Sequence, residues 1–240
     1  MKSCAVAHEC GCRHASGEFC AAKVPIFSNL ANEQLAMITK RITRRRYKKG
    51  QVVFWEGDLS DRFVIVHEGK IKIFRYTREG KEQILYILSE GDFLGDLSLL
   101  KKGVFQSNGE AIEDVSVCTI AKDDFDKILK ENPEISLRIL ESVHDRLEKL
   151  ENLVQTLSTK DMEARIASLL INFAKNFGYK RDDRIVLDLS LTREEMANFI
   201  GVTRETMSRK LSSMQEEGFI ELVGNKRIII NNLEDLEDLT

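Results

Sequence analysis

The sequence lacks the features of a membrane or secreted protein. No apolar run approaches the roughly 18 residues that a membrane-spanning helix needs. The first residues are polar and contain no apolar core of a secretory signal. These absences predict a cytoplasmic protein with no membrane partner.

The chain also lacks a strong net charge. Its formal charge at pH 7 is −3 over 240 residues, and residues 160–240 contain more Asp and Glu than Lys and Arg. Any DNA contact therefore has to come from a few placed basic groups, because bulk charge offers no support. The motifs include no nucleophile–base pair and no phosphate-binding loop, so we expect no enzymatic activity.

Cysteines are few and unevenly placed. Cys118 stands alone in an apolar, strand-like run, and the other four of the five lie near the N-terminus, at Cys4, Cys10, Cys12 and Cys20. An odd number leaves no complete pairing within one chain. In a reducing compartment such clusters bind metal or sense redox state more often than they form structural disulfides.

Thiolates suit iron–sulfur clusters or zinc, and a flexible arm could enclose such a group while Cys118 anchors it. His8 and His14 interleave with the N-terminal cysteines, so a zinc or copper site stays open. A thiol–disulfide switch between Cys118 and an arm cysteine is the third alternative.

Short apolar runs separated by glycine turns follow the cysteine-rich segment. Their spacing predicts strands of an antiparallel roll or barrel at residues 52–54, 63–66, 71–73, 84–88 and 115–120. The basic run KRITRRRYKK (residues 40–49) precedes them. We interpret it as the solvated end of a helix, rather than as a nucleic-acid patch, and assign it no function.

A long helix with one apolar stripe is expected after Pro133, because proline suits a first helical turn. Apolar residues recur there at spacings of four and three, at Ile139, Val143, Leu147, Leu150, Val154 and Leu157. This stripe predicts a dimer interface; a bundle helix within a monomer is the alternative.

The C-terminal region has the pattern of a winged helix-turn-helix. Thr192 and Glu195 form a capping box for one helix, and Gly201 provides the turn. Thr203 is the expected N-cap of a second helix. Residues 220–230, with a turn at Gly224, are predicted to form the β-hairpin wing. An ordinary helical hairpin is the alternative.

The expected fold class is α+β. We expect a sensory arm at residues 1–22, a cyclic-nucleotide-binding-like antiparallel β-roll at 23–132, a dimerisation helix at 133–159 and a winged helix-turn-helix domain at 160–240.

Two sequence segments resemble motifs of a known protein family. EGDFLGDLSLL (residues 90–100) resembles the GDxxGExxLL signature of the Crp/Fnr family of bacterial transcription regulators, with Asp96 in place of the usual Glu. TRETMSRKLSSMQEEGFI (203–220) resembles the recognition helix of that family. The resemblance covers nearly the whole chain. It implies a homodimer that binds double-stranded DNA and contacts RNA polymerase.

The resemblance also bears on the effector. Members that bind cyclic nucleotides hold the phosphate with an Arg-Ser pair, and the aligned residues here are Gln106 and Ser107. A neutral amide cannot replace the charge-assisted clamp of an arginine. The sequence therefore predicts that neither cyclic AMP nor cyclic GMP is the ligand.

The cysteines resemble those of the oxygen-sensing Fnr branch, in which three N-terminal cysteines and one distant cysteine hold a [4Fe–4S] cluster. The resemblance assigns Cys10, Cys12, Cys20 and Cys118 as ligands. The enteric pattern is CxxC, five residues, then C, whereas this chain has CxC, seven residues, then C. That departure leaves open the cluster type and whether Cys4 replaces Cys10 or Cys12.

The second helix carries the ExxSR pattern of the Fnr branch. Arg209 can bond to guanine, Glu205 can accept from cytosine and Ser208 can contact thymine, which together predict a TTGAT-like palindromic site. A simple ion pair between Glu205 and Arg209 is the alternative. Arg204 adds a possible base contact, and the family's phosphate-contacting positions fall on Arg193, Thr203 and Thr206.

The dimer helix departs from the enteric oxygen sensor at one position. That protein has an acidic side chain where this chain has Leu150, and its repulsion disfavours the cluster-free dimer. We therefore expect this chain to remain a dimer without metal.

Overall fold

The computed structural model describes residues 24–240 except 28–29, 95–102, 159–160, 183 and 225. By contact density the chain divides into two compact units. The first extends to Ile73 and includes Ile87–Val143, and the second comprises Phe74–Tyr86 and His144–Thr240. Among the described residues, no helix is long and apolar enough to cross a membrane.

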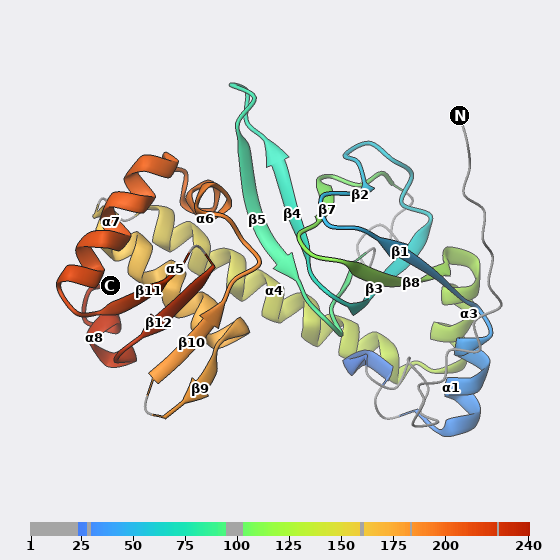
Figure 1. Cartoon of the computed structure of the whole chain (residues 1–240). Coiled ribbons are helices and arrows are strands. Elements are labelled where there is room, and N and C mark those ends of the chain that lie inside the picture. The colour runs from blue at the N-terminus through green and yellow to red at the C-terminus, as the bar shows by residue number, and fades with distance from the viewer. Residues whose placement is uncertain (1–23, 28–29, 95–102, 159–160, 183, 225) are drawn as a thin grey trace. The chain divides into compact units, whose positions relative to one another are not determined.

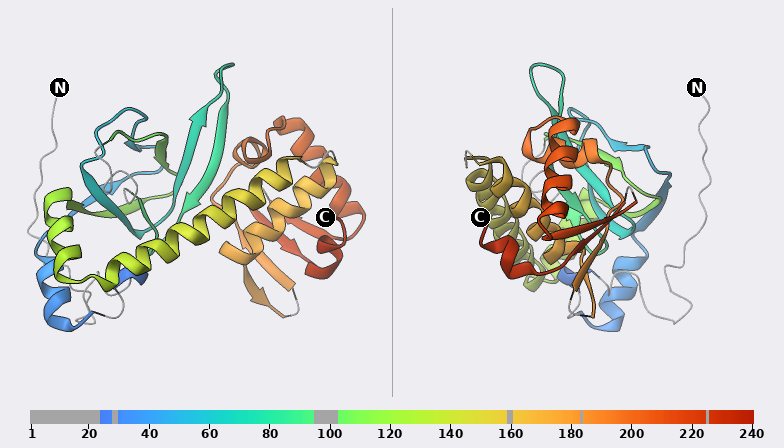
Figure 2. Two further views of the ribbon diagram at one scale, coloured as in Figure 1. Left: turned by 180° about the vertical axis from the view of Figure 1, so that it is seen from behind. Right: turned by 60° about the vertical axis from the view of Figure 1, so that its left-hand side comes forward.

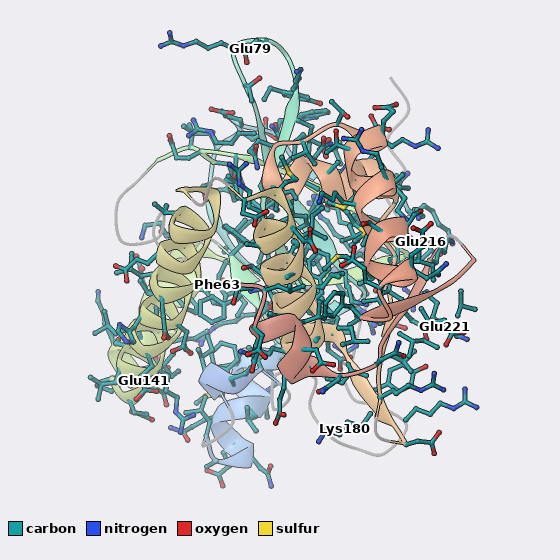
Figure 3. The ribbon with its side chains drawn as sticks, turned by 90° about the vertical axis from the view of Figure 1, so that its left-hand side faces the viewer. Phe63, Glu79, Glu141, Lys180, Glu216 and Glu221 are labelled. Atoms are coloured by element: carbon teal, nitrogen blue, oxygen red, sulfur yellow. The ribbon has the colours of Figure 1, made fainter. Side chains whose placement is uncertain are left out.

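The N-terminal half is an antiparallel β-roll built from two four-stranded sheets (Figure 1). One sheet has the order β1-β8-β3-β6, formed by Ile42–Tyr47, Val115–Ala121, Arg62–Glu68 and Phe93–Leu94. The other has the order β2-β7-β4-β5, formed by Val52–Phe54, Asn108–Ala111, Ile71–Tyr76 and Glu82–Leu88. Figure 3 labels Glu79 in the turn that joins β4 to β5. These sheets confirm the predicted roll and its main strands.

Helices cover one face of the β1-β8-β3-β6 sheet. Phe63 of β3 stacks on Phe125 of α3 (Lys122–Glu131), with ring centroids 4.3 Å apart; Figure 3 labels Phe63. Ile38 of α1 (Asn32–Thr39) and Ile135 of α4 (Glu134–Ser158) are buried in the same core. A short 3-10 turn, Pro25–Phe27, adds Ile26 and Phe27 to it.

The interpretation of residues 40–49 as a helix end was wrong for most of the run. The helix ends at Thr39, and Ile42–Tyr47 forms strand β1, which pairs with β8 in the register Ile42↔Ile120 to Tyr47↔Val115. Ile42 is 9% exposed and faces the core. Its burial and the pairing with β8 override the high charge of this segment.

In the second unit, helices pack on a small sheet with the order β11-β12-β10-β9 (Figure 2). Its strands are Ile220–Val223, Arg227–Ile230, Arg184–Asp188 and Tyr179–Arg181. Helix α5 (Met162–Phe177) contacts β10, α6 (Arg193–Ile200) contacts α5 and α7, and α7 (Arg204–Glu216) contacts β11. A short helix α8 (Leu233–Glu237) contacts α5. The order α6, α7 and hairpin β11–β12 confirms the predicted winged helix-turn-helix.

Candidate DNA-reading helix and sensor site

The first helix of the motif begins and ends as its sequence predicts. The Thr192 backbone N–H donates to Oε2 of Glu195 at 2.8 Å, and the Glu195 N–H donates to Oγ1 of Thr192 at 3.2 Å. This reciprocal capping box satisfies two N–H groups that the first turn leaves without partners. Gly201 ends α6 with φ 69° and ψ 38°, a left-handed conformation that glycine adopts without steric cost. The chain then turns directly into α7.

Helix α7 presents its polar face outward because its apolar face is fixed in the core. Thr203 is the N-cap, and its Oγ1 accepts from the Thr206 N–H at 3.2 Å. Met207, Leu211 and Met214 are 0% exposed and anchor the inner face. Of the residues expected to contact bases, Arg204, Glu205 and Arg209 are exposed, and Ser208 is half-buried beside them.

Two polar contacts that the sequence does not predict hold α7 to its neighbours. The Lys210 ammonium lies 2.9 Å from Oε2 of Glu163, at the start of α5. The Leu222 N–H of the wing donates to Oε1 of Gln215 at 2.8 Å. Lys210 and Glu163 are distant in sequence, and Gln215 reaches past the end of α7 to the following strand, so helical periodicity indicates neither contact. They fix the orientation of α7 within the second unit.

The charges on the outer face of α7 do not cancel one another. Among the described residues, no ion pair joins Glu205 to Arg209. Hydrogen bonds from its own backbone N–H and from Thr203 hold the pKa of Glu205 below its usual value, and Arg204 adds to this. Glu205 is therefore ionised at neutral pH and can accept hydrogen bonds. The guanidinium of Arg209 remains available to a partner.

The three residues assigned to phosphate contacts lie at the N-terminal ends of α6 and α7. Arg193 is half-buried, with Nη1 3.6 Å from Sδ of Met196, and burial lowers its pKa; an arginine stays charged at neutral pH regardless. Oγ1 of Thr203 lies 3.0 Å from Oγ1 of Thr206. Because Thr203 also caps α7, its hydroxyl already has a structural role that a phosphate contact would share.

The helix α4 carries two apolar faces rather than one. Ile139 is 7% exposed within the core of the first unit, and Val143 is packed against that core. Ile139 therefore packs in the core of its own chain and not at a dimer interface. Other apolar side chains of α4 are exposed, namely Leu137, Leu140, Leu147, Leu150 and Val154. The side chain of Leu157 lies outside the described residues.

The exposed face of α4 follows a seven-residue repeat. Leu140, Leu147 and Val154 are 61%, 53% and 64% exposed. Val143 and Leu150 fall between them at steps of three and four, as the seam of a coiled coil requires. The predicted dimer interface included Ile139 and not Leu140, because apolar residues one position apart satisfy the same spacing.

Cys118 is the described member of the expected metal-ligand set. It lies in β8, is 1% exposed and belongs to the same core as Phe63, Ile65 and Ile120. The other members, Cys10, Cys12 and Cys20, lie outside the described residues, as does Cys4. No group of His, Cys, Asp or Glu that could hold a metal occurs among the residues that are described.

The position expected to bind a cyclic phosphate carries no positive charge. Gln106 is exposed, and its Nε2 donates to the carbonyl of Val104 at 3.3 Å. Ser107 is half-buried beside it, and Asp96 lies outside the described residues.

A β-roll followed by a winged helix-turn-helix, with a capped helix presenting Arg, Glu and Ser outward, defines a DNA-binding regulator. Comparisons with known proteins agree. Residues 44–132 match the family "Cyclic nucleotide-binding domain", and residues 164–239 match "Crp-like helix-turn-helix domain". The chain belongs to the Crp/Fnr family of transcription regulators.

The relatives include regulators of two kinds. The chain is 31% identical to the CRP-like cAMP-activated global transcriptional regulator of Mycobacterium tuberculosis over 215 residues, covering 90% of this chain and 96% of that protein. It is 29% identical to the transcriptional activator protein FnrL of Cereibacter sphaeroides over 205 residues, covering 84% and 82%. The fold is similar to FixK2 from Bradyrhizobium japonicum, with a TM-score of 0.73, 22% identity and coverage of 82% and 96%.

Proposed function

We propose that this regulator senses oxygen or redox state through a [4Fe–4S] cluster bound by Cys10, Cys12, Cys20 and Cys118, and binds DNA as a homodimer. The observation that carries the proposal is the position of Cys118. Its side chain is buried in the same core as Val24, Ile26 and Phe27, which directly follow the cysteine-rich segment. We place this activity in the cytoplasm, with RNA polymerase as the further partner.

Covalent geometry supports a link between the two ends of the ligand set. Cys20 precedes Val24 by four residues, so its Cα lies within about 14 Å of that of Val24 whatever path the chain takes. Val24 is 4% exposed in the core that contains Cys118. The most C-terminal arm cysteine is thus covalently tethered to a residue of the core that contains Cys118.

The donor set fits a soft metal group. Four thiolates are the usual ligands of an iron–sulfur cluster, which supplies a redox-sensitive centre when bound. Cys118 is enclosed by apolar side chains, so a group at its Sγ has to be accommodated among them. Residues 24–27 and Leu30, which adjoin the arm, form part of this enclosure. Occupancy of the site would consequently be coupled to the packing of this segment on β8.

The proposed dimer uses the exposed apolar stripe of α4. Leu140, Leu147 and Val154, with Leu150 between them, would form the seam with a second copy of the chain. Leaving these side chains in water costs roughly 25 cal/mol per Å² of apolar surface. A two-fold dimer also pairs two copies of α7, as a palindromic DNA site requires.

The proposed DNA site is a TTGAT-like palindrome. Arg209 would bond to guanine, the ionised Glu205 would accept from a cytosine amino group and Ser208 would contact a thymine methyl. Arg204 would add a base contact. Arg193, Thr203 and Thr206 would hold the backbone through phosphate oxygens.

One relative supports a second candidate, activation by cyclic AMP, because the Mycobacterium tuberculosis regulator is described as cAMP-activated. The uncharged Gln106 argues against it, since an anionic phosphate would lose its main counter-charge. A thiol–disulfide switch or bound zinc would use the same cysteines in the same architecture.

The test is anaerobic reconstitution of the full chain with iron and sulfide, followed by a visible spectrum and metal analysis. The proposal predicts a brown protein with about four iron atoms per chain, bleached by air. Cys118→Ser should abolish iron binding because the described roll offers no other thiol, whereas Cys4→Ser should retain it. A colourless protein with stoichiometric zinc, or full iron binding by Cys118→Ser, would contradict the proposal.

A further inference from the structure

The apolar residues of α7 anchor the helix along a single stripe. Met207, Leu211 and Met214 are 0% exposed and follow one another at steps of four and three, so they lie on one side of the helix. Such a stripe fixes how deeply a helix is seated. It resists rotation about the helix axis less well, because apolar contacts are non-directional. Arg209 lies on the opposite side of α7, so the direction in which it points depends on that rotation.

Polar contacts flank this stripe on both sides. With about 100° of turn per residue, Lys210 falls roughly 70° to one side of the centre of the stripe, and Gln215 falls roughly 70° to the other. Nζ of Lys210 donates to Oε2 of Glu163 at 2.9 Å. Oε1 of Gln215 accepts from the Leu222 N–H at 2.8 Å. Hydrogen bonds are directional, so contacts on opposite flanks oppose rotation of α7 in both senses.

The partner of Lys210 is itself held in place. Glu163 lies in the first turn of α5, and its backbone N–H donates to Oδ1 of the N-cap Asp161 at 2.9 Å. The helix dipole also stabilises a carboxylate in a first turn. Ala164 and Ala167 are buried and seat this turn in the core of the second unit. Glu163 therefore offers a fixed acceptor on α5 rather than a mobile surface charge.

The positive charge of Lys210 is committed to this acceptor. Lys210 directly follows Arg209 in the sequence, where a lysine would be expected to contact a DNA phosphate. Its side chain is instead only 31% exposed and pairs with the carboxylate of Glu163, which is 24% exposed. Among the described residues, this is the only ion pair that α7 forms. The guanidinium of Arg209 is exposed and forms none.

We infer that Glu163 and Lys210 are positioning residues for DNA reading. Their pair sets the rotation of α7 and so aims Arg209 at its base, while Lys210 contacts no phosphate. Glu163 thus contributes to sequence discrimination from a different helix without touching DNA. The pair adds no net charge, so its effect falls on specific binding and not on the general attraction to a duplex. The inference rests on the proposed base-reading role of Arg209 and is independent of the cysteines and the effector.

The test measures binding of the anaerobically prepared full chain to two duplexes by fluorescence anisotropy. One duplex is selected from a random pool by the wild-type protein, and the other is its scrambled form. Glu163→Gln and Lys210→Met each break the pair while keeping most of the side chain, and the double variant completes a mutant cycle. Lys175→Met is the matched control, because it breaks a 3.6 Å pair with Glu237 that joins α5 to α8 and leaves α7 untouched. Thermal denaturation checks that each variant remains folded.

Glu163→Gln and Lys210→Met should each lower the ratio of selected to scrambled affinity about fivefold, within the range for residues coupled in one salt-bridge network. The double variant should lose no more than either single variant. Affinity for the scrambled duplex and the slope of log K against log salt should stay at the wild-type values. Lys175→Met should bind both duplexes as the wild type does.

A phosphate contact by Lys210 would give a different result. Lys210→Met would then weaken binding to both duplexes and reduce the salt slope by about 1, whereas Glu163→Gln would free the ammonium and strengthen both. Either result would overturn the inference, as would an unchanged affinity ratio in both variants. Arg209→Ala is measured in parallel. If it loses discrimination and the pair variants do not, the inference fails alone; if it keeps full discrimination, the base-reading proposal fails and the inference fails with it.

Discussion

At the scale of single residues, the outer face of α7 combines the ionised carboxylate of Glu205 with the exposed guanidinium of Arg209. Glu205, Ser208 and Arg209 lie on one helix with the polar face outward, as their spacing indicates. What the spacing could not show is that Glu205 faces Thr203 and Arg204 rather than Arg209. Nor could it show that Cys118 is enclosed on all sides. Rotamers and burial depend on contacts between distant segments, which local patterns do not encode.

Arg209 is expected to read a base. Arg209→Ala should weaken binding to the TTGAT palindrome by about 1–3 kcal/mol and relax discrimination at one guanine. Fluorescence anisotropy with the cognate duplex and with duplexes changed at that position measures both effects. Equal losses on cognate and scrambled DNA would show that Arg209 does not read sequence.

Arg193 is expected to bind phosphate and so provides the contrast. Arg193→Ala should weaken binding to cognate and scrambled duplexes alike and reduce the slope of log K against log salt by about 1. Salt titrations from low to physiological ionic strength measure that slope. A loss confined to the cognate duplex would move Arg193 into the base-reading group.

At the scale of elements, helix ends and glycine turns were the most predictable features. The Thr192–Glu195 box and Gly201 are local signals, and the structure confirms both. The interpretation of this segment as a helix end was wrong for strand β1. Its Ile, Thr and Arg residues form a strand because they pair with β8. The register of the α4 stripe was likewise ambiguous. Ile139 and Leu140 are adjacent apolar residues, and only packing assigns one to the core and the other to the surface.

The exposed stripe of α4 predicts a dimer that persists without metal. Leu150→Asp should shift the metal-free protein toward monomer, because the dimer would bury two like charges near the two-fold axis. Sedimentation velocity at micromolar concentration measures the shift.

Leu137→Asp is the matched control for that substitution. Leu137 is 65% exposed on the same helix but falls outside the seven-residue repeat. The control should remain a dimer. A metal-free wild type that is already monomeric would show that the stripe does not suffice for dimerisation.

At the scale of the whole molecule, the family follows from the order of its parts, and the effector does not. A roll, a long helix and a winged helix-turn-helix are visible in the sequence and confirmed by the structure. Members with this architecture include a cAMP-activated regulator and FnrL. The identity of the effector therefore depends on a few residues, chiefly Cys118 and Gln106. Their roles depend on what binds beside them, and neither hydropathy nor periodicity encodes that.

The most direct test of the account measures DNA affinity before and after oxygen in one sample. Anaerobically reconstituted protein is titrated against the TTGAT palindrome by fluorescence anisotropy, exposed to air and titrated again, with sedimentation run in parallel. The account predicts tight, specific binding that falls markedly after air exposure while the protein remains dimeric. An affinity that oxygen leaves unchanged, in protein shown to carry the cluster beforehand, would contradict it.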